Sequence, residues 1–157
     1  MKALDHDYYM GLALERARLR FAAGDRPIYS LVVQPDGSVA GEAGNTVARD
    51  IDPSAHAEVN AIRIACTRLG TVDLSGCTLY TPLEPCPMCL ATILEARIST
   101  LVLGARHRRV GRADLRNYSV ESYLASVSKQ VEVVPGVREQ ECEALRLEWK
   151  RLSREDA

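Results

Sequence analysis

The first 44 residues show one helical and two extended hydrophobic patterns. Residues 7–23 carry apolar positions at helical spacing, which predicts an amphipathic helix. Residues 28–33 and 38–44 are short runs of the kind that form strands. Pro35-Asp36-Gly37 separates them and is typical of a turn, because proline presets φ and glycine accepts a positive φ. The pattern therefore predicts a helix followed by a β-hairpin.

The remainder of the chain alternates helices with strands. Ser54 follows a polar loop and is placed to cap the next helix. The buried face of that helix is predicted to comprise Val59, Ile62, Ala65, Cys66 and Leu69. Three strands are predicted at residues 78–81, 100–103 and 131–134. Three further helices are predicted, one opened by Pro85-Cys86-Pro87, one at 119–128 and one at about 138–153.

This element order predicts an α/β fold. Strands that alternate with helices are joined by right-handed crossovers, which gives a mostly parallel sheet after the initial hairpin. Such a sheet needs helices on both faces, so we expect a three-layer α/β/α sandwich around a five-stranded mixed sheet. We expect one domain over residues 1–157, with a core at about 28–134 and a C-terminal helix at about 138–153.

Composition and charge narrow the function classes. Net charge is −1, so no global electrostatic attraction to nucleic acid or anionic lipid is expected. No apolar run is long enough to span a membrane, and the N-terminus lacks the pattern of a secretion signal. We therefore expect a cytoplasmic protein without membrane contacts. In that compartment thiols stay reduced, so the five cysteines are interpreted as metal ligands or core residues.

Two short motifs fall at predicted helix starts. His56-Ala57-Glu58 opens one helix, and Cys86 and Cys89 are three residues apart at the start of the next. That spacing puts both sulfurs on one side of a helix, where the terminus favours thiolates. One imidazole and two thiolates suit zinc, and three protein ligands leave a coordination position open for water, as in catalytic sites. We therefore expect one Zn²⁺ per chain and a proton-transfer role for Glu58.

These motifs are those of zinc-dependent base deaminases. The chain resembles the cytidine and deoxycytidylate deaminase superfamily from about residue 6 to about residue 149, and most resembles its branch of bacterial tRNA adenosine, guanine and nucleoside deaminases. The resemblance is carried by residues 52–58, 79–80 and 83–89, with further matches at 41–45 and 104–106. It implies a homodimer, and it implies that Asn45 hydrogen-bonds the target base.

Tyr29, Glu84 and His107 are further candidates for substrate contact. Tyr29 and Ser30 stand where relatives usually have small residues, and His107 stands where the tRNA enzymes usually have an acidic residue. Structural alternatives remain open: Tyr29 as a core residue, His107 as a surface residue, Asn45 as a turn residue, and Glu84 held by backbone hydrogen bonds.

A basic cluster follows the predicted fourth strand. It consists of Arg106, His107, Arg108, Arg109, Arg112 and Arg116. The cluster is interpreted in three ways: as a phosphate contact on nucleotides or RNA, as a solvated loop, or as part of a subunit interface.

Three hypotheses for function follow. The first is a zinc-dependent hydrolase that deaminates a small nucleobase or nucleoside such as guanine or cytosine and releases ammonia. The alternative is a tRNA-specific adenosine-to-inosine deaminase, which needs a surface for nucleic acid. The third is a non-catalytic partner subunit, which the presence of Glu58 disfavours, since such partners often lack this acid.

Overall fold

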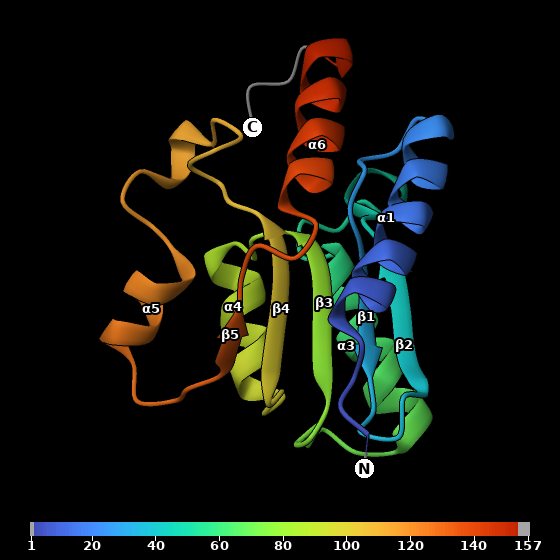
Figure 1. The fold of residues 1–157 in the computed structure, drawn as a ribbon, viewed down its shortest axis with the longest axis vertical. Helices are drawn as coiled ribbons and strands as arrows, with labels where there is room; N and C mark the ends of the chain where they lie inside the picture. The colour runs from blue at the N-terminus through green and yellow to red at the C-terminus, as the bar shows by residue number, and fades with distance from the viewer. Residues whose placement is uncertain (1, 154–157) are drawn as a thin grey trace.

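The fold is built on one mixed sheet. The computed structural model of the protein describes residues 2–153. Five strands lie in the order β2-β1-β3-β4-β5. Their bounds are Tyr29–Val33, Val39–Gly44, Thr78–Leu83, Thr100–Ala105 and Glu132–Val134 for β1 to β5. The sheet, with helices on both of its faces, confirms the predicted α/β fold (Figure 1).

Strand directions divide the sheet into two halves. β1 pairs antiparallel with β2 and with β3, whereas β3, β4 and β5 are mutually parallel. The predicted hairpin and the parallel fifth strand are therefore both confirmed. Because β3 and β4 are parallel, their carboxyl ends meet at one end of the sheet, where such folds place their sites.

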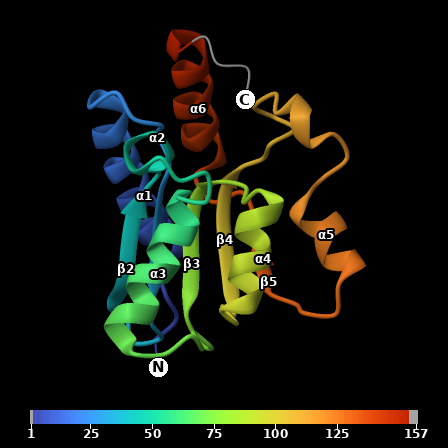
Figure 2. The same cartoon turned by 180° about the vertical axis from the view of Figure 1, so that it is seen from behind.

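Helices cover the sheet on two sides. One face carries α1 (His6–Ala22) and α6 (Glu139–Ser153), and the other carries α3 (Ala57–Leu69) and α4 (Pro87–Glu95) (Figures 1 and 2). α5 (Val120–Ser126) packs beside α4, and its Leu124 belongs to the core on that side.

Each face buries its own hydrophobic core. Strand residues alternate between them, so that Val32 and Leu79 face α3 and α4 while Leu31 and Tyr80 face α1. The approach of α3 to the sheet is very close: a Cβ on Gly41 would lie 2.3 Å from the carbonyl oxygen of Ala61. Glycine at this position is what lets α3 lie against β2.

Two short elements were not predicted, and one predicted helix cap is wrong. Residues 47–50 form a short helix, α2 (Val47–Asp50), and residues 113–115 form a 3₁₀ turn, η1 (Ala113–Leu115), neither of which the apolar pattern indicated. Ser54 does not cap α3, because its hydroxyl and its amide both bind the carboxylate of Asp52. His56 occupies the N-cap position of α3 instead.

Within residues 2–153, no helix combines the length and the apolar character that a membrane crossing requires.

Candidate active site

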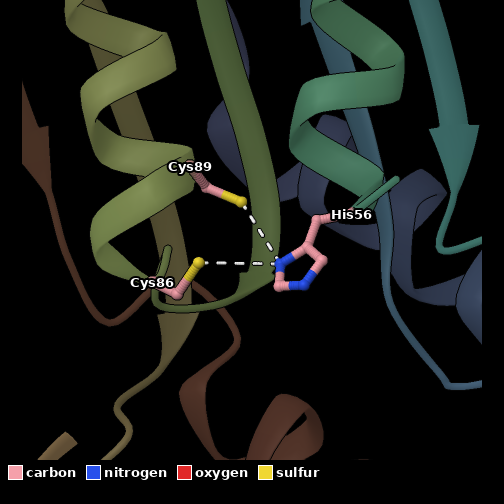
Figure 3. A group of neighbouring side chains, drawn as sticks. All are labelled: His56, Cys86 and Cys89. Carbon is pink, nitrogen blue, oxygen red and sulfur yellow. Dashed lines mark hydrogen bonds between the residues drawn. The ribbon is translucent and has the colours of Figure 1, made fainter. Parts of the chain in front are cut away.

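One imidazole and two thiols converge where α3 and α4 begin. The Nδ1 atom of His56 lies 3.6 Å from the Cys86 sulfur and 3.4 Å from the Cys89 sulfur. Figure 3 shows both sulfur atoms directed at this nitrogen of the His56 ring. The ligand atoms of these three side chains all lie within 4.8 Å of one another, a spacing that suits a metal ion. Among the histidine, cysteine and acidic side chains of residues 2–153, this is the group found with such spacing.

Helix geometry explains the convergence. His56 and Cys86 are the N-cap residues of α3 and α4, and neither side chain is used for capping. Pro87 starts α4, and Cys89 lies in its first turn. Both helix termini contribute partial positive charge, which favours thiolate at the two sulfurs.

The donor distances fit zinc. Tetrahedral coordination with Zn–S bonds of about 2.3 Å and Zn–N bonds of about 2.05 Å places nitrogen and sulfur about 3.5 Å apart. The nitrogen–sulfur distances of 3.6 and 3.4 Å agree with that value. The donor set of two sulfurs and one imidazole nitrogen is also the set that zinc favours.

Glu58 is the buried acid beside this group. Its side chain is 5% exposed, and its Oε2 atom accepts a hydrogen bond from the Cys89 thiol at 3.6 Å. Burial raises the pKa of Glu58 to about 7, with a further contribution from negative charge on Cys86. A carboxyl group with this pKa exchanges protons readily at neutral pH, as general acid–base catalysis requires.

The two thiols have opposite proton affinities. The contact with the Cys89 thiol lowers the pKa of Cys86 to about 4, and the contact with His56 adds to this effect. The contact with Cys86 and burial raise the pKa of Cys89. The hydrogen bond to Cys86 raises the pKa of His56. Without metal, the group therefore retains protons that zinc binding would release.

Asn45 directly follows β2, and the amide of the next residue, Thr46, donates to the carbonyl of Ala55, which precedes His56. The side-chain carbonyl of Asn45 accepts from the amide of Val47, and its side-chain NH₂ has no hydrogen-bond partner among residues 2–153. The segment is held by Asn60, whose NH₂ donates to the Gly44 carbonyl, the Thr46 hydroxyl and the Ala55 carbonyl. Asn45 therefore keeps a donor available in a fixed position.

Glu84 is fully engaged with the protein. It is 3% exposed, and its two oxygens accept from the amides of His107 and Val120 and from the guanidinium of Arg106. These bonds connect the end of β3 with the segment that leaves β4. The prediction of substrate contact stays a prediction for Glu84, whose contacts here are with the protein.

His107 and Tyr29 lie in different surroundings. His107 is 2% exposed and lines a cavity beside the end of β4, and burial lowers its pKa. Tyr29 packs with the core on the α1 side, and its hydroxyl donates to Glu42 at 3.2 Å. The structure therefore does not bring Tyr29 to the group formed by His56 and the cysteines.

Three residues near the site were missed in the sequence. Tyr118 donates its hydroxyl to the Pro85 carbonyl at 2.6 Å and so supports the loop before Cys86. Trp149 lines a cavity of about 210 Å³ together with Asn45 and Arg26. Asn60 had the one available signal: it is four residues after His56, on the same side of the helix.

The other three cysteines do not take part in this group. Cys77 and Cys142 are buried in the two cores, and Cys66 is half-buried on α3. All five cysteines are free thiols.

Comparison with protein families identifies a match over most of the chain. Residues 4–105 match the family described as the cytidine and deoxycytidylate deaminase zinc-binding region. This range contains His56, Glu58, Cys86 and Cys89.

Curated relatives of several kinds match the chain. A tRNA(Ile)-lysidine synthase of Deinococcus deserti is 45% identical over 105 residues, which are 67% of this chain and 20% of that protein. The chain thus spans about a fifth of that relative. A guanine deaminase of Bacillus subtilis is 39% identical, covering 70% of each protein. A tRNA-specific adenosine deaminase of Haemophilus influenzae is 35% identical, covering 85% of this chain and 76% of that protein.

Solved structures of tRNA and guanine deaminases superpose on this chain. A structure from a study of A-to-I editing by tRNA:A34 deaminases superposes with a TM-score of 0.76 and 36% identity, covering 88% of this chain and 98% of that one. A guanine deaminase of Nitrosomonas europaea superposes with a TM-score of 0.79 and 25% identity, covering 96% and 87%.

Proposed function

The chain belongs to the cytidine and deoxycytidylate deaminase family, and we propose that it deaminates the ring of a nucleobase or nucleoside such as guanine or cytosine. It is a hydrolase of the kind that acts on cyclic amidines, as its deaminase relatives are. The observation that carries the proposal is the Glu58 carboxylate, buried beside a cysteine sulfur that faces an imidazole nitrogen.

His56, Cys86 and Cys89 would hold one zinc ion per chain. When bound, zinc supplies a Lewis acid that makes water nucleophilic at neutral pH. The fit rests on the sulfur and nitrogen donors and on their separations.

Glu58 then accepts and donates the protons that are transferred in the reaction. Its carboxylate accepts a proton from the attacking water and returns one to a ring nitrogen. A C–O bond forms at the ring carbon, the bond to the amino group breaks, and ammonia leaves with a second proton passed by Glu58. Its burial beside the candidate ligands places this carboxyl group where it can accept and donate these protons.

Asn45 would orient the base. Its side-chain NH₂ is available to donate to a ring carbonyl or ring nitrogen, while its side-chain carbonyl is fixed by the Val47 amide. Trp149 would form one side of the space beside Asn45, since both residues line the same cavity.

A substrate panel tests the proposal. The purified zinc-loaded protein is incubated with guanine, cytosine, adenine, their nucleosides and total tRNA, and ammonia and product masses are measured. Deamination of a base or nucleoside is expected. Turnover of none of the small molecules would refute this choice of substrate.

Adenosine in tRNA is the second candidate substrate. Relatives favour it: a tRNA-specific adenosine deaminase covers 85% of the chain, and the structure from the tRNA:A34 study covers 88%. Inosine found by sequencing tRNA after incubation, together with activity that falls steeply with salt, would select this candidate.

A non-catalytic partner subunit is the remaining alternative. It would bind zinc and turn over no base, nucleoside or RNA. The buried Glu58 beside the candidate ligands argues against it, because partner subunits of this kind often lack this acid.

The proposal also includes that the protein forms a homodimer and is located in the cytoplasm. Light scattering on the purified protein gives the mass in solution, and a monomer at all concentrations would refute the dimer.

A further inference from the structure

A cavity of about 610 Å³ opens beside the carboxyl end of β4. All six residues of the basic cluster line it: Arg106, His107, Arg108, Arg109, Arg112 and Arg116. The connection that carries them leaves the sheet at the end where α3 and α4 begin (Figures 1 and 2). The cavity therefore lies at the same end of the molecule as the candidate active site.

Three of the five arginines are neutralised within the chain. Arg106 pairs with Glu84 and Glu121, Arg112 pairs with Asp114, and Arg109 pairs with Glu143. These three guanidinium groups have their charge compensated, so they do not by themselves require a ligand.

Arg108 and Arg116 differ from them. Both are exposed, and neither has an ion pair or hydrogen bond with any side chain among residues 2–153. Two cations without a compensating carboxylate from the described part of the chain therefore stand in the wall of the cavity.

His107 supplies an independent observation. It is 2% exposed, and its ring nitrogens make no hydrogen bond of regular geometry among the described residues, although the Pro85 backbone lies close to the ring. A buried polar atom without a partner is costly, so a ligand or water that pairs with it is favoured.

Tyr118 links this cavity to the candidate active site. It lines the cavity, its ring lies 6.0 Å from that of His107, and its hydroxyl binds the carbonyl of Pro85. Pro85 directly precedes Cys86. A molecule whose ring lies at the Cys86 side could therefore extend a second group into the cavity.

We propose that this cavity binds a phosphate group of the substrate, held by Arg108 and Arg116 and by a hydrogen bond from His107. Guanidinium groups match phosphate oxygens with paired, charge-assisted hydrogen bonds. This inference rests on the proposed deamination of the ring and extends its substrate from a free base or nucleoside to a nucleotide unit. The phosphate is the 5′-group of a nucleoside monophosphate or a phosphodiester of an RNA strand.

Binding of reaction products tests the cavity without turnover. Inosine, xanthosine and uridine are compared by calorimetry with their 5′-monophosphates and with a seven-nucleotide single-stranded RNA that contains inosine. Because a charge-assisted hydrogen bond is worth about tenfold or more in affinity, the phosphate-bearing form of one ring is expected to bind at least about tenfold tighter.

Two double variants locate the effect. Arg108→Ala with Arg116→Ala removes the proposed contacts and is expected to abolish the advantage of the phosphate. Arg68→Ala with Arg97→Ala is the control for the loss of two positive charges, because Arg68 lies in the last turn of α3 and Arg97 two residues after the end of α4, away from the cavity, where Arg68 donates to the Val39 carbonyl and Arg97 pairs with Asp73. The control is expected to keep the advantage.

The outcomes separate the sources of the phosphate. Preference for a monophosphate identifies a terminal phosphate, and preference for the RNA alone, lost in the cavity variant, identifies a phosphodiester. No preference for any phosphate-bearing form, or a preference that survives in the cavity variant, overturns the inference. Phosphate binding without ammonia release on any substrate would instead refute the deamination and leave the cavity assignment standing.

Discussion

The candidate zinc site and the basic-cluster cavity lie at the same end of the sheet but are built differently. The first takes its side chains from the starts of two regular helices, α3 and α4, each packed on the core. The second takes them from an irregular connection whose one regular element is the three-residue turn η1. At the zinc site, the spacing of the residues along each helix determines where the ligand atoms lie. In the second, geometry depends on contacts from elsewhere, notably the Glu84 carboxylate that binds the amides of His107 and Val120.

The largest effect is expected at the buried acid of the zinc site. Glu58→Ala should lower ammonia release by about 10²–10⁴-fold, the usual contribution of a positioned general acid–base group. The zinc content should stay that of the parent protein, because Glu58 is not among the three candidate ligands.

Glu95→Ala is the control for that variant. Glu95 lies at the other end of α4 in an exposed pair with Lys129, so its loss should leave turnover unchanged. Full turnover by Glu58→Ala would contradict the assigned role.

Thiol reactivity in the zinc-free protein should separate Cys86 from Cys66. The pKa of Cys86 is lowered to about 4, so its thiolate fraction, and hence its alkylation rate, should change little between pH 8 and pH 6. Burial raises the pKa of Cys66, so its rate should fall about tenfold for each pH unit over the same range.

Mass spectrometry of iodoacetamide adducts measures both rates. Added zinc should protect Cys86 and leave Cys66 unchanged. Equal pH dependence for the two thiols would show that the contacts of Cys86 do not stabilise its thiolate.

The contact between β2 and α3 should tolerate an added methyl group less well than other close contacts do. Gly41→Ala places a methyl group against the backbone of α3, which can relieve the clash only by moving the helix that carries His56 and Glu58. Overpacking of this kind costs about 1–3 kcal/mol, and urea unfolding should give the upper part of that range.

Gly104→Ala provides the comparison. The added methyl group would meet the Cys142 sulfur, which can rotate away, and then the Cys142 Cβ at 2.8 Å and the Pro82 carbonyl oxygen at 3.0 Å, whereas at Gly41 two backbone atoms lie closer than these. The loss of unfolding free energy should therefore be smaller than for Gly41→Ala. The reverse order would mean that α3 is not fixed by its contact with β2.

The smallest effect is expected in the irregular segment. Asp114→Ala removes an ion pair with Arg112 in which the aspartate is half exposed, and such pairs contribute at most about 1 kcal/mol. The melting temperature should change little. A large loss of stability would show that the segment is as tightly determined as the zinc site.

Residue spacing explains how much could be predicted. The hairpin, the parallel strands and the helices of the core follow from periodicity, and two cysteines three apart at a helix start can share one ligand. The same reasoning put His56 beside them, because the starts of α3 and α4 meet at the carboxyl end of β3.

Long-range contacts explain what could not be predicted. No local pattern shows that Tyr118 supports Pro85, or that Trp149 of the last helix reaches the cavity beside Asn45. Tyr29 was predicted as a substrate contact because it stands where relatives usually have small residues, yet strand alternation turns its side chain to the α1 face. The chain path around a site is set by tertiary packing, which a single sequence does not display.

X-ray absorption at the zinc edge tests the central claim most directly. For the purified protein with one zinc per chain, we expect two sulfur neighbours at about 2.3 Å and two nitrogen or oxygen neighbours at about 2.0–2.1 Å. That shell corresponds to Cys86, Cys89, His56 and one exchangeable solvent position. A shell filled by a further cysteine or histidine, or a protein that binds no zinc, would contradict the account.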